Sequence, residues 1–89
     1  MIEREVEIVN RLGLHARAAA KVVHLAGRYQ SDVKLVKDGD EVDAKSILGL
    51  LMLAAAQGER LHVRCSGDDE EQALQALSEL IAGRFGEDS

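Results

Sequence analysis

The sequence predicts an α+β domain in which four short strands form one antiparallel sheet and helices cover a single face of it. Three observations support this fold class. Residues 2–9 and 60–66 alternate apolar and polar side chains as half-buried strands do, three other segments are composed like helices, and Asp38-Gly39 marks a tight hairpin turn. The predicted order of elements is βαββαβα.

The first strand and the first helix follow from two different patterns. In residues 2–9 the apolar and acidic side chains fall on opposite sides, as in a half-buried strand. Residues 16–26 are rich in alanine and contain Val22, Val23 and Leu25, which predicts a helix. Gly27 follows where a left-handed helix cap is expected.

The middle of the chain predicts a hairpin and a second helix. Residues 32–37 and 40–43 are short strand-like runs on either side of Asp38-Gly39, a dipeptide that accepts the positive φ angles of a tight turn. Ser46 can cap a helix over residues 47–56, which Gly58 would close.

The last strand and the last helix complete the pattern. Residues 60–66 place Leu61, Val63 and Cys65 on the inward side of a strand. Asp68 and Glu71 resemble a capping box for a helix that reaches about residue 84. That helix carries one apolar stripe, formed by Leu74, Leu77, Leu80 and Ile81.

Length and composition predict one domain over residues 1–89 without a disulfide. The chain has 89 residues, 46% of them hydrophobic, and a single cysteine. No apolar run is long enough to cross a membrane, and the acidic, alternating start is unlike a secretory signal, so we expect a cytoplasmic protein with no membrane contact. A net charge of −5 and only two aromatic residues argue against nucleic acid as the partner.

The charges are unevenly distributed along the chain. Between residues 8 and 31 there is no acidic residue, whereas four basic ones occur there: Arg11, Arg17, Lys21 and Arg28. Residues 67–89 show the opposite bias, with seven acidic residues and only Arg84 as a basic one. One end of the domain is therefore expected to attract anions.

His15 is the main candidate for chemistry. It stands where a serine, threonine, aspartate or asparagine would normally cap the first helix, and imidazole is a poor substitute for them. The free backbone N–H groups of Ala16, Arg17 and Ala18, together with the Arg17 guanidinium, would form an anion site in which neutral imidazole can attack phosphorus. The alternative is an exposed loop histidine beside a surface arginine.

The second helix is apolar on nearly every side. A sheet covered on one face cannot bury all of this surface, so Ile47, Leu48 and Leu51 are candidates for a partner docking patch. The alternative is that the helix lies deep in the core. Ser46 is most simply a helix cap, although a phosphate there would place negative charge beside the patch and so regulate docking.

The other histidines and the cysteine are expected to be structural. His24 lies nine residues from His15 along one helix, which places them about 13 Å apart, too far to share a metal ion. His62 is expected on the outward side of its strand and Cys65 on the inward side. The sequence therefore predicts no metal site and no cofactor.

Two segments resemble a known family. Gly13-Leu14-His15-Ala16-Arg17-Ala18-Ala19 resembles the active-site signature of the histidine-containing phosphocarrier (HPr) family of the bacterial sugar phosphotransferase system. Lys45-Ser46-Ile47-Leu48-Gly49 resembles the family's regulatory-serine segment, at the matching distance along the chain. The resemblance implies an open-faced β-sandwich, a four-stranded antiparallel sheet with three helices on one face.

The resemblance also implies roles and partners. His15 would accept a phosphoryl group from phosphorylated enzyme I and pass it to IIA domains of sugar permeases, with Arg17 steadying the group. Ser46 would be modified by a serine kinase and phosphorylase. The chain would then be a monomeric phosphoryl carrier with a phosphohistidine intermediate and not an enzyme.

Ala18 departs from the family pattern, which has proline at this position. Both residues fit the first turn of a helix, and alanine keeps an N–H that can face a phosphate. The departure leaves open a related regulatory module, of a nitrogen-type relay or acting through Ser46. A nucleic-acid-binding domain is a weaker alternative, because the outward strand faces lack aromatic residues.

Overall fold

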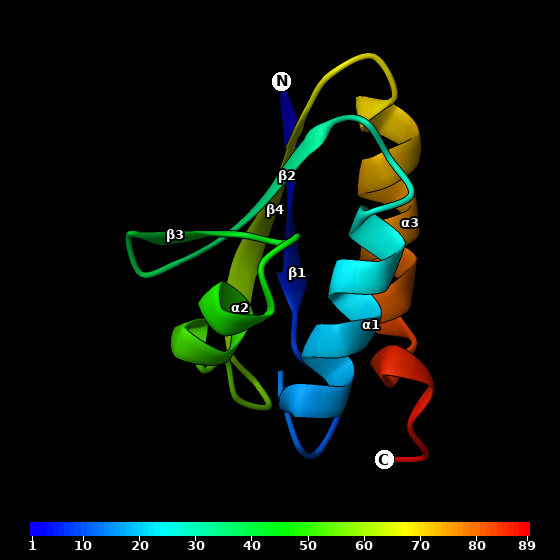
Figure 1. Ribbon diagram of the computed structural model, residues 1–89. Coiled ribbons are helices and arrows are strands. Elements are labelled where there is room, and N and C mark those ends of the chain that lie inside the picture. The colour runs from blue at the N-terminus through cyan, green and yellow to red at the C-terminus, as the bar shows by residue number, and fades with distance from the viewer.

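The computed structural model describes residues 1–89 and confirms the predicted fold class and order of elements (Figure 1). The strands are β1 (Ile2–Glu7), β2 (Asp32–Lys37), β3 (Asp40–Asp43) and β4 (Arg60–Ser66). The helices are α1 (Ala16–Ala26), α2 (Ile47–Leu53) and α3 (Glu70–Ala82), followed by a short 3-10 helix, η1 (Arg84–Gly86). None of these helices is long and apolar enough to span a bilayer.

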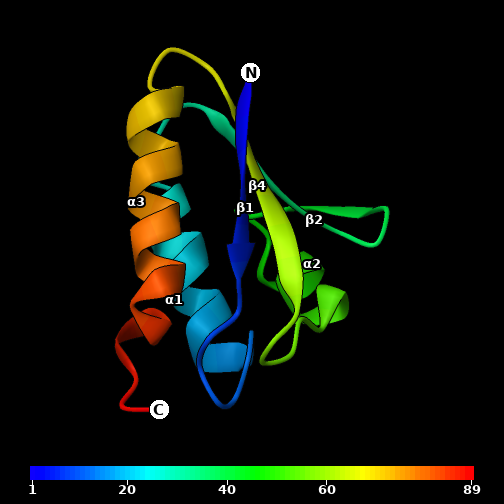
Figure 2. The same ribbon diagram turned by 180° about the vertical axis from the view of Figure 1, so that it is seen from behind.

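The four strands form one antiparallel sheet in the order β1-β4-β2-β3. The helices lie on one side of the sheet and leave its other face open (Figures 1 and 2). β4 shows the consequence of its alternating sequence, because Leu61, Val63 and Cys65 are fully buried beneath the helices. On the open face, His62 and Arg64 of β4 form ion pairs with Glu3 of β1.

The core lies between the sheet and the helices α1 and α3. The alanine-rich side of α1 packs closely, with Ala18, Ala19, Val22 and Ala26 all fully buried. α3 contributes the predicted stripe, of which Leu77 and Ile81 are the most deeply buried. Phe85 in η1 is also fully buried, and burial of such a side chain contributes about 1.5 to 3 kcal/mol. The segment after α3 is therefore anchored to the body of the domain.

The hairpin forms as predicted, whereas the cap at Gly27 does not. Asp38 and Gly39 have φ angles of 51° and 86°, the left-handed conformations that a tight two-residue turn requires. Gly27 has φ −65°, and its N–H bonds the Val23 carbonyl at 2.9 Å. The left-handed cap predicted there is wrong, because the chain continues into right-handed turns before β2.

α2 is three residues shorter than the predicted helix over residues 47–56. It ends at Leu53, because Ala54 adopts a left-handed conformation with φ 52°. The Ala55 carbonyl is thereby free to accept a hydrogen bond from the N–H of Leu14 at 2.9 Å. A helix continued through Ala56 would withdraw this contact from the loop that precedes α1.

The predicted capping box of the last helix is also wrong. α3 begins after Asp69, whose side chain does not cap the helix. The Asp69 carboxylate instead accepts hydrogen bonds from the N–H groups of Gln30 and Ser31, both at 2.9 Å, and from the Ser31 hydroxyl at 2.5 Å. Glu70 accepts a hydrogen bond from the N–H of Gly67. Contacts with a distant loop have replaced the local cap.

Candidate functional site

His15 occupies the N-cap position of α1, as the sequence predicted. Its backbone is extended (φ −78°, ψ −179°), and its side chain makes no capping hydrogen bond. The first N–H bonded within the helix is that of Ala19, which donates to the His15 carbonyl at 2.8 Å. The N–H groups of Ala16, Arg17 and Ala18 have no acceptor; Ala16 and Arg17 are exposed, whereas Ala18 is buried. An anion beside His15 would reach the first two most directly.

The loop that carries His15 is fixed from two sides. Gly13 has φ +66°, and a Cβ there would lie 2.6 Å from the Ala55 carbonyl oxygen, so only glycine fits. Leu14 donates its N–H to the same carbonyl. The buried Asn10 donates from Nδ2 to the Gly13 carbonyl at 2.8 Å. These contacts orient the chain immediately before His15.

The C-terminal segment brings a carboxylate to His15. Glu87 Oε2 forms a hydrogen bond with His15 Nε2, and Glu87 Oε1 accepts one from Asn10 Nδ2 at 2.9 Å. Hydrogen bonds from Asn10 and His15 lower the pKa of Glu87 below its usual value, so the group is a carboxylate at neutral pH. The sequence predicted only positive neighbours for His15. The fold corrects this, because the acidic end of the chain returns to the basic loop.

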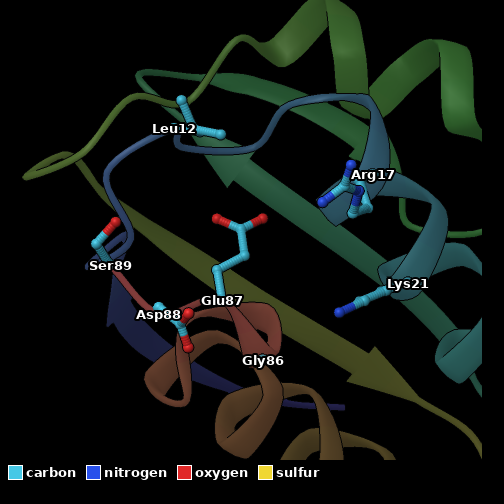
Figure 3. A pocket seen from close by; sticks show the side chains of 7 residues that line it. All are labelled: Leu12, Arg17, Lys21, Gly86, Glu87, Asp88 and Ser89. Carbon is cyan, nitrogen blue, oxygen red and sulfur yellow. The ribbon is translucent and has the colours of Figure 1, made fainter.

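A pocket opens beside this contact (Figure 3). The Glu87 side chain extends to its middle, and the side chains of Arg17 and Lys21 point into it from α1. Lys21 Nζ donates to the Phe85 carbonyl at 2.5 Å, whereas the Arg17 guanidinium forms no hydrogen bond or ion pair. An unpaired guanidinium at the mouth of the pocket is available to bind the oxygens of an anion.

α2 presents an apolar surface to solvent next to the His15 loop. We call Ile47, Leu48, Leu51 and Met52 the α2 patch; their exposed fractions are 44%, 65%, 40% and 75%. Leu50 and Leu53, on the other side of the helix, are buried. The first three patch residues were predicted to be exposed, and Met52 was not identified from the sequence.

Ser46 caps α2, as predicted. Its Oγ accepts a hydrogen bond from the N–H of Gly49 at 3.2 Å, and the residue is exposed. The hydroxyl thus lies at the edge of the α2 patch. A charge added to it would stand beside Ile47 and Leu48.

Sequence reasoning missed Asn10 and Glu87, whose roles depend on contacts across the fold. The sequence signal for Asn10 was a polar residue directly after an apolar strand pattern. In the sequence, Glu87 is one of several acidic residues near the end of the chain, and no local pattern links it to His15.

The other candidates lie away from His15. His24 is exposed on α1, and His62 forms an ion pair with Glu3 at 3.2 Å on the open face of the sheet. Cys65 is buried, and burial raises the pKa of its thiol. No three side chains of histidine, cysteine, aspartate or glutamate come together as a metal site would require.

The chain is similar to known proteins over nearly its whole length. The sequence model of the family described as "PTS HPr component phosphorylation site" matches residues 2–83. The chain is 52% identical to the phosphocarrier protein HPr of Cupriavidus necator over 87 residues, covering 98% of both chains. It is also 52% identical to that of Xylella fastidiosa over the whole of both chains. The crystal structure of HPr-C-His from Thermoanaerobacter tengcongensis superposes with a TM-score of 0.96 at 44% identity, covering 100% of each chain.

Proposed function

The chain belongs to the HPr family of phosphocarrier proteins, and we propose that His15 is the residue that carries its phosphoryl group. The observation that supports this most directly is the position of His15, beside helix N–H groups without acceptors and a guanidinium without a partner. This arrangement suits a dianionic group bound to the imidazole. The carrier shuttles the group between other proteins and is not itself an enzyme.

In this proposal the domain positions the histidine and surrounds it with positive charge. The partner proteins donate and accept the phosphoryl group. The donor is phosphorylated enzyme I, and the acceptors are IIA domains of sugar permeases. The Arg17 guanidinium binds the phosphoryl oxygens while nitrogen attacks phosphorus in line with the departing group. The same relay implies a cytoplasmic protein that acts as a monomer.

Phosphoryl labelling tests the assignment of His15. The chain is incubated with enzyme I and phosphoenolpyruvate and then analysed by intact mass spectrometry. We expect one added phosphoryl group, labile to acid and stable to base. His15→Ala should abolish the label, whereas His24→Ala, which removes an exposed histidine from the same helix, should keep it. A labelled His15→Ala protein would refute the assignment.

We further propose that the α2 patch docks the partner proteins and that Ser46 regulates this docking. The support is the exposure of four large apolar side chains beside an exposed helix-capping hydroxyl. Phosphorylation of Ser46 by a serine kinase would add about two negative charges at the rim of the patch, and a phosphorylase would remove them.

Two substitutions at Ser46 test the regulatory role. Asparagine and aspartate both cap helices well, but only aspartate adds a charge. We expect Ser46→Asp to weaken binding to a IIA domain several-fold in calorimetry and Ser46→Asn to leave it unchanged. Equal affinities for the two variants would remove the electrostatic explanation.

A further inference from the structure

A second pocket lies between α1 and α3, and neither His15 nor Glu87 lines it. The two helices lie side by side in both views of the ribbon (Figures 1 and 2). We call this pocket the α1–α3 groove. Its volume is about 430 Å³, and pockets that bind small molecules usually measure about 300 to 1,000 Å³. The groove therefore has the size of a small-ligand site.

The apolar part of the groove is aliphatic. Leu25 of α1 and Leu80 of α3 are half-buried and pack against the core, and Ala20 of α1 adds an exposed methyl group. The methylene groups of the neighbouring arginine and lysine side chains extend this apolar surface while their charged ends stay in water. An alkyl chain placed here would be removed from water together with the two leucines, which favours binding.

Every charged group that lines the groove is basic. The four are spaced at i, i+4, i+7 and i+11 along one side of α1 and its C-terminal turn: Arg17, Lys21, His24 and Arg28. Only Lys21 has a partner, the Phe85 carbonyl at 2.5 Å, and the other three side chains form no hydrogen bond or ion pair. No acidic side chain lines the groove, although the net charge of the protein is −5. The groove is thus a locally positive surface that attracts anions.

We propose that the α1–α3 groove binds a small organic anion that carries an alkyl chain. The basic side chains His24 and Arg28, which stand one helical turn apart, hold the anionic head. The alkyl chain lies on Leu25 and Leu80. The ligand is a free molecule because the groove is a recess of small-molecule size. This site does not depend on the role proposed for His15.

Octyl phosphate is the probe for this site, because it joins an alkyl chain to an anionic head. Inorganic phosphate supplies the head alone and 1-octanol the chain alone. In NMR titrations of the isotope-labelled protein, read at the methyl groups of Leu25 and Leu80, we expect a Kd of about 1 mM for octyl phosphate. The other two compounds should bind about tenfold more weakly or less. Nuclear Overhauser effects from the octyl chain to these methyl groups would locate the ligand.

Substitutions of exposed residues test the charge and the space in the groove. Arg28→Gln removes one unpaired charge and should weaken the binding of octyl phosphate about fivefold. Arg11→Gln is its matched control, because Arg11 belongs to the same basic segment but does not line the groove. Ala20→Glu places a carboxylate in the groove and should weaken binding about tenfold or more. Ala82→Glu adds the same charge on α3 outside the groove and should have little effect.

Several outcomes would overturn the proposal. One is octyl phosphate that binds no tighter than inorganic phosphate or 1-octanol. Another is an octyl chain that contacts Leu48 or Met52 of the α2 patch instead of the two groove leucines. Equal losses in Arg28→Gln and Arg11→Gln would reduce the binding to general attraction of charge. Sedimentation of the protein with vesicles of equal phosphatidylglycerol and phosphatidylcholine, without binding of octyl phosphate, would assign the groove to a bilayer surface instead.

Discussion

The segments on either side of α1 are each held by a carboxylate from the last third of the chain, but to different effect. After the C-terminal end, in the loop before β2, Asp69 accepts three hydrogen bonds from Gln30 and Ser31. At the N-terminal end, Glu87 binds Asn10 and His15. In Figure 1 the yellow part of the chain lies beside the loop after α1, and the red part lies near the first turn of α1.

The difference between the two ends lies in the hydrogen-bond donors. Backbone N–H groups and a hydroxyl do not titrate near neutral pH, and Ser31 is buried, so the contact of Asp69 is structural. The imidazole of His15 keeps a second nitrogen free for chemistry when Glu87 engages the first. Similar carboxylate contacts therefore hold a structural loop after α1 and the candidate reactive histidine at its N-terminus.

Of the substitutions that test this difference, Gly13→Ala at the His15 end is expected to reduce stability the most. Alanine is strained at φ +66°, and its Cβ would lie 2.6 Å from the Ala55 carbonyl oxygen. We expect a loss of about 3 kcal/mol in unfolding free energy, together with slower phosphoryl acceptance. Gly39→Ala is the control, because Gly39 also has a positive φ but no atom within 4 Å, and it should lose only about 1 kcal/mol. Urea denaturation with equal losses for both would contradict the steric explanation.

A smaller effect is expected from Ser31→Ala at the Asp69 end. The substitution removes a hydrogen bond to a charged group, which should lower the unfolding free energy by about 2 kcal/mol. Phosphoryl acceptance by the folded protein should not change. The control is Ser78→Ala, since the Ser78 hydroxyl is buried without a partner and its removal should cost little. A slower phosphoryl transfer in Ser31→Ala would mean that the two ends are coupled.

The smallest effect is expected in the pH dependence of stability. Hydrogen bonds from Ser31 and Gln30 lower the pKa of Asp69 below its ordinary value of 3.8, and those from Asn10 and His15 lower the pKa of Glu87 below 4.5. The unfolded chain therefore binds more protons than the folded one in this range, so stability is full above these ordinary values and falls as the pH drops through the lowered ones.

Urea titrations from neutral to strongly acidic pH would measure this loss. Asp69→Asn should be less stable than the wild type at neutral pH and should lose less stability on acidification, because its side chain no longer titrates. Glu87→Gln should likewise lose less stability than the wild type on acidification. Variants with the acid dependence of the wild type would show that other carboxyl groups control it.

Local patterns were enough to predict most of the fold. The bounds of β2, β3, β4 and α1 match the prediction, because period-two alternation, the Asp-Gly turn and an alanine-rich helix depend on near neighbours in the chain. The errors lie at Gly27, at the end of α2 and at the start of α3. At the last two, Ala55 and Asp69 bond a distant loop instead of completing a local helix end.

The candidate site likewise has one part that the sequence predicts and another that only the structure shows. The sequence by itself determined that a histidine stands at a helix N-terminus beside an arginine, because both lie in one short segment. Only the tertiary structure decided that Glu87 and Asn10 complete this site, because the two residues are 77 positions apart and meet through the burial of Phe85. Residues that share a helix end are fixed by backbone geometry, whereas residues from opposite ends of the chain meet only when the core between them has formed.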